Sequence, residues 1–385
     1  MPPLEVRAQS LEELRTHRSE KWREFPEDVL PLPVAEMDFP IAAPIREILL
    51  EMVSHSDLGY LGPIPELPRA FSQFAEKRWN WKSDPAQIHL ATDVGVGVVE
   101  VLRLLTSPGE KVVVNSPVYH NFYTWINETH LERVDVPFIE FENGWFLDFD
   151  ALEESYKQGA KVHLLCNPQN PLGRLFTKEE LLRIARLAAE YSVIVISDEI
   201  HAPLTYSEAT FIPFLSLGPD AESVGIVVTA ASKAWNIAGL KCAIVISQSE
   251  AMDAVLRKLP QATHYRASLL GGFASAAAFE QGEEWLDGVI TTLDSNRQHL
   301  AELLAKKIPE IKYRLPQNSY LAWLDMSALE MGNNPSSVLL ERGRVALSPG
   351  RSFAPHTPHF VRLNFATSHS VLEEAVNRMV VAIHG

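Results

Sequence analysis

Five short runs of β-branched apolar residues, separated by helical patterns, place the strongest constraint on how this chain folds. The runs are KVVVN, KVHLLC, SVIVIS, VGIVVT and CAIVIS, at residues 111–115, 161–166, 192–197, 224–229 and 242–247. Helical stretches lie between them, such as residues 177–191, which open on a T-x-x-E capping box at Thr177 and Glu180. This alternation predicts a mostly parallel sheet with helices on both faces, so the fold class is α/β.

The length of the chain predicts two domains. Its 385 residues exceed one ordinary hydrophobic core. Residues 1–44 are proline-rich near their end, and we expect an irregular arm that joins the smaller domain. Residues 45–285 form the large α/β domain. Residues 286–385 begin with a long polar helix at about 286–307 and continue with IKYRL, YLAWLDM and FVRLNFA, predicted strands of a small α+β domain that alternate between buried and exposed positions.

Charge and composition narrow the range of partners. The formal net charge is −15, which disfavours nucleic acid or an anionic membrane as the main partner because both need a basic face. We find no apolar run of the ~18 residues that cross a bilayer, and the first residues lack the apolar core of a signal peptide. Cys166 and Cys242 are too few for a disulfide framework. We therefore expect a soluble, cytoplasmic protein with two buried free thiols.

Polar residues follow three of the predicted strands. Asn170 lies in NPQNPLGR after the strand that ends at residue 166, Asp198 directly follows the strand at 192–197, and Lys233 follows the strand at 224–229. In open α/β sheets, ligands bind outside the carboxyl ends of the strands. Each residue alone has an ordinary structural explanation, but the three together predict one site at one sheet edge.

A lysine, a carboxylate and an amide donor together suit pyridoxal phosphate. A lysine forms a Schiff base with an aldehyde, and a carboxylate keeps the pyridine nitrogen protonated so that the ring accepts electrons. The amide donates a hydrogen bond to the ring oxygen. The cofactor's phosphate also needs a site, and Asp93 is a plausible N-cap of a helix within residues 91–105 whose first amides bind an anion. The candidate phosphate ligands are the amides of Val94 and Gly95 with the side chains of Ser232 and Lys241.

The motifs NPQNPLGR, SDEIH and SKAWNIAGLK resemble those of the fold-type I pyridoxal-phosphate enzymes of the class I/II aminotransferase superfamily. THRSEKW, VAEMDFP, GYLGP and SPVYHNF further resemble the bacterial cystathionine β-lyase-like branch, most of whose members are carbon–sulfur lyases. The resemblance covers nearly the whole chain. It implies an aspartate aminotransferase-like fold with a seven-stranded sheet in the large domain. It also implies a homodimer with active sites at the subunit interface and a role in amino-acid metabolism, specifically in methionine biosynthesis.

The resemblance also implies roles for individual residues. Lys233 is the Schiff-base lysine and the catalytic base, Asp198 pairs with the pyridine nitrogen, and Asn170 bonds the ring oxygen. Tyr119 stacks on the ring, and His201 lies close to it. The phosphate is held by Ser232, Lys241 and the amides of Val94 and Gly95. Substrate contacts come from Arg362, which grips the α-carboxylate, from Asn170, and from Tyr60, which reaches the phosphate or substrate of the neighbouring subunit.

Four residues depart from the pattern of the branch. Arg23 stands where an acidic residue is expected, Glu36 where aspartate is usual, and Gln169 where histidine is common. Asp93 places a carboxylate near the predicted phosphate site. These departures concern substrate specificity and the predicted phosphate site, whereas the lysine, aspartate and asparagine of the cofactor site are intact.

The predicted activity is α,β-elimination of a cysteine thioether to a thiol, pyruvate and ammonia. An aminotransferase that acts on an amino acid and a 2-oxo acid is the alternative, because both reactions use the same residues. A regulatory protein that only binds the cofactor is a further alternative, disfavoured by the intact Lys233, Asp198 and Arg362. A nucleotide-binding enzyme lacks its glycine motifs, and HTPH at residues 356–359 suggests no third metal ligand.

Overall fold

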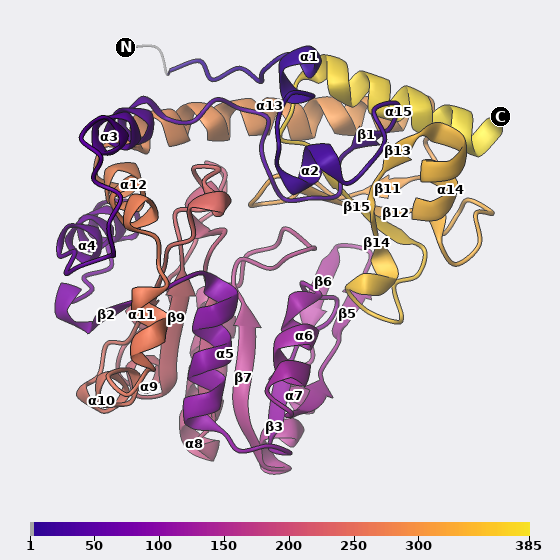
Figure 1. Ribbon diagram of the computed structural model, residues 1–385. Helices are drawn as coiled ribbons and strands as arrows, with labels where there is room; N and C mark the ends of the chain where they lie inside the picture. Colours follow the sequence, from indigo (N-terminus) through magenta and orange to yellow (C-terminus); the bar gives the residue numbers. More distant parts are fainter. Residues whose placement is uncertain (1–3) are drawn as a thin grey trace.

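A seven-stranded sheet forms the centre of the larger part of the molecule (Figure 1). The structure is a computed structural model and describes residues 4–385. The strand order is β2-β10-β9-β8-β7-β3-β4. The strands are β2 (Ile88–Ala91), β3 (Lys111–Val114), β4 (Glu132–Asp135), β7 (Ala160–Cys166), β8 (Ile194–Asp198), β9 (Gly225–Thr229) and β10 (Ala243–Ile246). The five predicted strands all form within a residue or two of their expected bounds.

The sheet is mostly parallel, as predicted. Neighbouring strands from β9 to β4 pair in parallel, and β10 is antiparallel to both β2 and β9. All five residues of β9 are buried, which is typical of a parallel strand covered by helices on both faces. The predicted α/β class, with a seven-stranded and mostly parallel central sheet, is confirmed.

Ten α-helices of the described residues belong to this larger part. They are α3 (Ala43–Ser54), α4 (Glu66–Trp79), α5 (Val94–Leu105), α6 (Asn121–Glu128), α7 (Phe149–Lys157), α8 (Lys178–Tyr191), α9 (Pro219–Val224), α10 (Glu250–Leu256), α11 (Gln261–Tyr265) and α12 (Leu269–Gln281). The predicted capping box is present at the start of α8, where Thr177 accepts from Glu180 N and the Glu180 carboxylate accepts from Thr177 N. A hairpin of β5 (Phe138–Phe141) and β6 (Gly144–Leu147) lies outside the main sheet.

The C-terminal part contains a four-stranded sheet of order β11-β12-β15-β14. Its elements are α13 (Glu283–Lys307), β11 (Lys312–Tyr313), β12 (Leu321–Asp325), α14 (Pro335–Gly343), β13 (Val345–Ala346), β14 (Ser348–Pro349), β15 (Phe360–Asn364) and α15 (His369–His384). The predicted alternation along these strands is wrong, because four of the five residues are buried in both β12 and β15. Helix α14 contacts this sheet, and the N-terminal segment lies against it, with Asn364 N donating to Leu32 O at 2.9 Å.

The N-terminal arm is more regular than the sequence predicted. It contains the short helices α1 (Leu11–Leu14) and α2 (Glu20–Arg23) and the strand β1 (Leu30–Pro31). Ser10 and Glu13 form a capping box for α1. Strand β1 pairs in parallel with β13, so the arm is joined by strand pairing to the C-terminal part. The domain boundaries at residues 44 and 285 stay predictions.

Cys166 and Cys242 are both free and buried. Within residues 4–385, the helices are all too short or too polar to cross a membrane.

Candidate active site

A cavity of about 970 Å³ lies at the carboxyl ends of the central strands, between the main sheet and the C-terminal part. Asn170 follows β7, Asp198 ends β8 and Lys233 follows β9, and all three line this cavity. Parallel neighbouring strands end at the same sheet edge, which is why residues far apart in sequence meet here. The structure therefore brings together the three residues predicted to form one site.

Lys233 lies at the cavity wall with its amine directed at the N-terminal arm. Its Nζ donates to Ala35 O at 3.1 Å. Burial and the nearby Arg362 lower the pKa of Lys233 to about 8, although Glu36 and Asp198 act in the opposite direction. A substantial fraction of the amine is therefore neutral near physiological pH, as a nucleophile or base requires.

Asp198 is a buried carboxylate, 6% exposed, at the tip of β8. Its Oδ1 accepts a hydrogen bond from Ile200 N at 3.1 Å. Burial raises the pKa of Asp198 to about 7, while this backbone hydrogen bond and Lys233 lower it. A buried carboxylate that faces a cavity is stabilised when a cationic group enters, so Asp198 suits a protonated ring nitrogen.

Arg362 on β15 reaches the same cavity from the C-terminal part. Its Nη1 donates to Asn170 Oδ1 at 3.0 Å and its Nη2 to Pro33 O at 2.9 Å. The guanidinium lies 4.8 Å from the ring centroid of Phe353. Among the described residues its buried Nε has no hydrogen-bond partner. Arg362 is only 4% exposed and burial lowers its pKa to about 10, so a buried cation is available for an anionic substrate group.

His201 and Tyr119 also line the cavity. His201 Nδ1 lies 3.0 Å from Ser319 Oγ, and burial lowers the pKa of His201 to about 3, so its ring is neutral. Tyr119 packs edge-on against Trp125 with ring centroids 6.1 Å apart, and its hydroxyl accepts from Asn121 Nδ2 at 2.7 Å. Burial raises the pKa of Tyr119, which keeps the phenol neutral.

The predicted phosphate residues meet at the start of α5. Val94, Gly95, Ser232 and Lys241 all line the cavity. Asp93 is the N-cap, and its Oδ1 accepts from Val96 N at 2.8 Å while its Oδ2 lies 3.0 Å from Lys241 Nζ. A Cβ on Gly95 would come within 3.0 Å of the Trp125 indole, so glycine lets this ring pack closely against the helix start. Backbone amides at a helix start and a lysine suit a phosphate, although Asp93 already pairs with that lysine.

Tyr60 is the one predicted site residue that lies outside this cavity. It is 91% exposed and lines a second, smaller cavity of about 260 Å³ with Tyr265 and Leu58. The predicted reach of Tyr60 into a neighbouring subunit stays a prediction.

Two of the four departures from the family pattern line the cavity, namely Glu36 and Asp93. Gln169 is buried within its loop, where Nε2 donates to Pro117 O at 2.5 Å and Oε1 accepts from Leu172 N at 3.0 Å. Gln169 therefore ties two loops together. Arg23 is exposed at the end of α2.

Several cavity residues were missed by sequence reasoning. Trp125 lines it from α6 and Arg266 from the C-cap of α11, and the main chain of residues 33–35 closes one side. The pattern THYRAS around Arg266 carries no recognisable motif, and backbone carbonyls leave no trace in a sequence. The residues fit pyridoxal phosphate, because a lysine amine, a buried carboxylate and the first residues of a helix line one cavity. Within the described part of the chain, no group of three potential side-chain ligands could hold a metal ion.

Comparisons with known proteins identify the family and the fold of this chain. Residues 28–379 match the family model of the class I and II aminotransferases. The cystathionine beta-lyase of Corynebacterium glutamicum is 36% identical and the match covers 97% of this chain and 99% of that protein. The crystal structure of AecD from Corynebacterium diphtheriae superposes with a TM-score of 0.94 at 33% identity, over 99% of both chains. Cystalysin from Treponema denticola, whose crystal structure contains pyridoxal 5′-phosphate, gives a TM-score of 0.91 at 27% identity over 99% of both chains.

Proposed function

Because the chain belongs to the class I and II aminotransferase family, we propose that it is a pyridoxal-phosphate-dependent carbon–sulfur β-lyase. Its substrate is a cysteine thioether such as cystathionine, and its products are a thiol, pyruvate and ammonia. The observation that carries this proposal is the convergence of Lys233, Asp198 and Arg362 on one cavity, in a chain that is 36% identical to a cystathionine beta-lyase.

Each residue has a defined task in the proposed reaction. Pyridoxal phosphate, when bound, supplies an electron-withdrawing ring that stabilises negative charge at the substrate α-carbon. Lys233 attaches the cofactor and, once free, removes the α-proton of the substrate. Asp198 holds the proton on the ring nitrogen, and Asn170 donates its amide to the ring oxygen. Arg362 binds the α-carboxylate, for which its buried and partly unpaired guanidinium is suited.

The remaining predicted residues hold the cofactor in place. Tyr119 packs on one face of the ring, and His201 borders it as a neutral group. The phosphate is bound by Ser232, Lys241 and the amides of Val94 and Gly95. These assignments are supported by the position of every one of these residues at the same cavity wall.

An aminotransferase uses the same residues, and the experiment must separate the two reactions. Protein loaded with pyridoxal phosphate is given L-cystathionine, first without and then with a 2-oxo acid. The proposal predicts continuous formation of pyruvate and ammonia in both cases. Turnover that requires the 2-oxo acid would identify an aminotransferase. Reduction of the loaded protein with borohydride, followed by peptide mass spectrometry, tests independently whether Lys233 carries the cofactor.

A homodimer with shared active sites is part of the proposal. The exposed Tyr60, Leu58 and Tyr265 form an apolar surface around the second cavity, which suits a subunit contact. Mixing Tyr60→Ala with Lys233→Ala subunits tests this arrangement, because the mixed dimer regains one complete site. Random pairing should restore about a quarter of the activity of the unchanged protein. No restoration after verified subunit exchange would contradict a shared site.

We also place the protein in the cytoplasm, where free buried thiols such as Cys166 stay reduced.

A further inference from the structure

Residues 33–38 of the N-terminal arm, here called the strap, lie between the lysine and the arginine of the candidate active site. Ala35 O accepts from Lys233 Nζ at 3.1 Å and from Tyr320 Oη at 3.0 Å. Pro33 O accepts from Arg362 Nη2 at 2.9 Å. One short piece of main chain therefore touches both the residue that acts at the α-carbon and the residue that binds the carboxylate.

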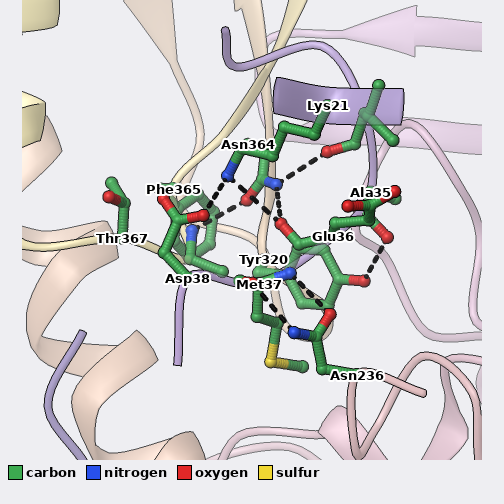
Figure 2. A network of polar contacts seen from close by, with 12 residues as sticks. Lys21, Ala35, Glu36, Met37, Asp38, Asn236, Tyr320, Asn364, Phe365 and Thr367 are labelled. Carbon is green, nitrogen blue, oxygen red and sulfur yellow. Dashed lines mark hydrogen bonds and ion pairs between the residues drawn. The ribbon is translucent and has the colours of Figure 1, made fainter. Parts of the chain in front are cut away.

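Two asparagines hold the strap from opposite sides (Figure 2). Asn236 comes from the loop that carries Lys233, and its side chain makes two hydrogen bonds to the main chain of Met37, accepting from N and donating to O, both at 2.8 Å. Asn364 comes from β15, two residues after Arg362, and its Nδ2 donates to Val34 O at 2.8 Å and to Glu36 O at 2.6 Å.

A buried ion pair fixes the end of the strap. Lys21 Nζ lies 2.6 Å from Asp38 Oδ1, and both side chains are almost fully buried. Asp38 N also donates to Ala366 O at 2.9 Å. These contacts join the strap to α2 and to the chain that follows β15. Among the hydrogen bonds of residues 4–385, those that link the strap to the Lys233 loop come from the Asn236 side chain and from Lys233 itself.

The backbone at Asn236 is unusual for its residue type. Its φ is +57°, in the left-handed region, which asparagine tolerates better than most residues but glycine adopts at lower cost. The strained conformation aims a side chain that can donate and accept at once toward the Met37 peptide group. An alanine would lose both hydrogen bonds, whereas a glycine would lose them and relieve the backbone.

We infer that Asn236 is a positioning residue, which acts through the strap to keep Ala35 O on Lys233. Asn364 has the corresponding task for Arg362. The strap thereby sets the spacing between the group that moves the α-proton and the group that holds the carboxylate. A misplacement on the lysine side lowers kcat, whereas a misplacement on the arginine side raises KM. This inference rests on the proposed use of pyridoxal phosphate at Lys233, but it holds for elimination and for transamination alike.

The test compares Asn236→Gly and Asn236→Ala with Asn364→Ala in protein loaded with pyridoxal phosphate. Asn80→Ala is the matched control, because Asn80 has a similar φ of +54° and is an exposed helix C-cap. We expect Asn236→Gly to lower kcat by about tenfold with little change in KM. We expect Asn364→Ala to act mainly on KM, and Asn80→Ala to change neither constant.

A substrate-free measurement separates positioning from folding. The absorbance of the bound cofactor is titrated with pH, which reports the protonation of the nitrogen supplied by Lys233. If the strap shifts in Asn236→Gly, the Ala35 carbonyl moves away from this nitrogen and no longer favours its protonated form. The midpoint should therefore fall by roughly half a pH unit or more. The charged groups that face Lys233 are Arg362, Glu36, Asp198 and Lys241, and all are unchanged in this variant.

The outcomes are distinct. A lower midpoint and a lower kcat in Asn236→Gly, with a melting temperature close to that of the unchanged protein, support the inference. A folded Asn236→Gly protein with unchanged midpoint and kcat would overturn it. Because glycine relieves the backbone at this position, the variant stays informative if Asn236→Ala fails to fold. A failed lyase assay with a shifted midpoint would contradict the proposed reaction and leave the positioning role standing.

Discussion

Arg362 Nη1 donates to Asn170 Oδ1 at 3.0 Å, so the candidate carboxylate-binding arginine is held by the candidate cofactor-binding asparagine. The contact joins β15 of the small sheet to the loop after β7 of the large sheet. It occupies the oxygen of the Asn170 amide and leaves the NH₂ group as the donor for the cofactor. In the proposed function, a shift of Arg362 on binding the substrate carboxylate would therefore also move the side chain that holds the cofactor ring.

Replacement of Arg362 by alanine should reduce kcat/KM for an amino-acid thioether by at least about a hundredfold, because a buried charged contact to the carboxylate is lost. Arg362→Lys should recover little of this loss, since an ammonium cannot make the paired contacts of a guanidinium. Steady-state kinetics of pyruvate formation provide the measurement. The corresponding amine without a carboxylate should bind the unchanged protein and both variants equally, and a large difference there would point to a general collapse of the site.

Cofactor binding should depend on pH through Asp198. Burial raises the pKa of Asp198 to about 7 in the free site, and a protonated ring nitrogen would lower that pKa on binding. A group whose pKa falls on binding favours the complex at high pH, so affinity should weaken as the pH drops below about 7. Lys233 acts in the same direction, because its pKa of about 8 in the free site means that it loses its proton to react.

Equilibrium titration of cofactor-free protein with pyridoxal phosphate, repeated across this pH range, measures the effect. Asp198→Asn keeps the shape of the side chain and removes its titration. This variant should bind the cofactor more weakly and retain only the pH dependence that Lys233 causes. Identical pH profiles for the variant and the unchanged protein would show that Asp198 does not pair with the ring nitrogen.

Asp93 should oppose phosphate binding. Its Oδ2 pairs with Lys241 at 3.0 Å, while its Oδ1 caps α5. Asp93→Asn keeps a capping oxygen and removes the negative charge. We expect pyridoxal phosphate to bind this variant about two- to fivefold more tightly, a modest gain because the pair is partly exposed to solvent. Weaker binding to Asp93→Asn, measured by the same titration, would instead show that Asp93 is needed to orient Lys241.

The buried Lys21–Asp38 pair should be important for stability. Lys21→Met leaves the Asp38 carboxylate buried without its partner, so the free energy of unfolding should fall by about 3–5 kcal/mol. The double variant Lys21→Met with Asp38→Leu should recover much of this loss. Urea denaturation measures the change, and Lys82→Met, which breaks the exposed pair with Glu76, is the control in which little change is expected. A small effect of Lys21→Met alone would contradict this account of the pair.

The sequence predicted the large sheet well because buried parallel strands and their helices leave strong periodic signals. The runs that became β7, β8 and β9 are continuous and apolar, and the polar residues at their tips follow directly. The small sheet was predicted less well. The sequence pattern suggested that its strands alternate between buried and exposed positions. Arg362 and Asn364 are nevertheless buried, because the strap covers them and its carbonyl groups accept their hydrogen bonds.

Other parts of the site had no signal in the sequence. The carbonyls of Pro33 and Ala35 enter through main-chain geometry, and Arg266 reaches the cavity only because α11 lies beside α5 and β2. Arg362 was identified by resemblance, since an arginine in an apparently alternating strand would ordinarily face solvent. Local sequence patterns thus predict helices, strands and the residues at strand ends. Contacts between segments far apart in the sequence become visible only in the folded structure.

Elimination of a thiol from a cysteine thioether is the reaction proposed for this site. The most direct test gives the cofactor-loaded protein L-cystathionine without any 2-oxo acid and follows pyruvate and thiol together over many turnovers. We expect sustained and equal release of both products, abolished in Lys233→Ala. A single conversion of the bound cofactor to its amine form, with no release of pyruvate or thiol, would contradict it and identify an aminotransferase.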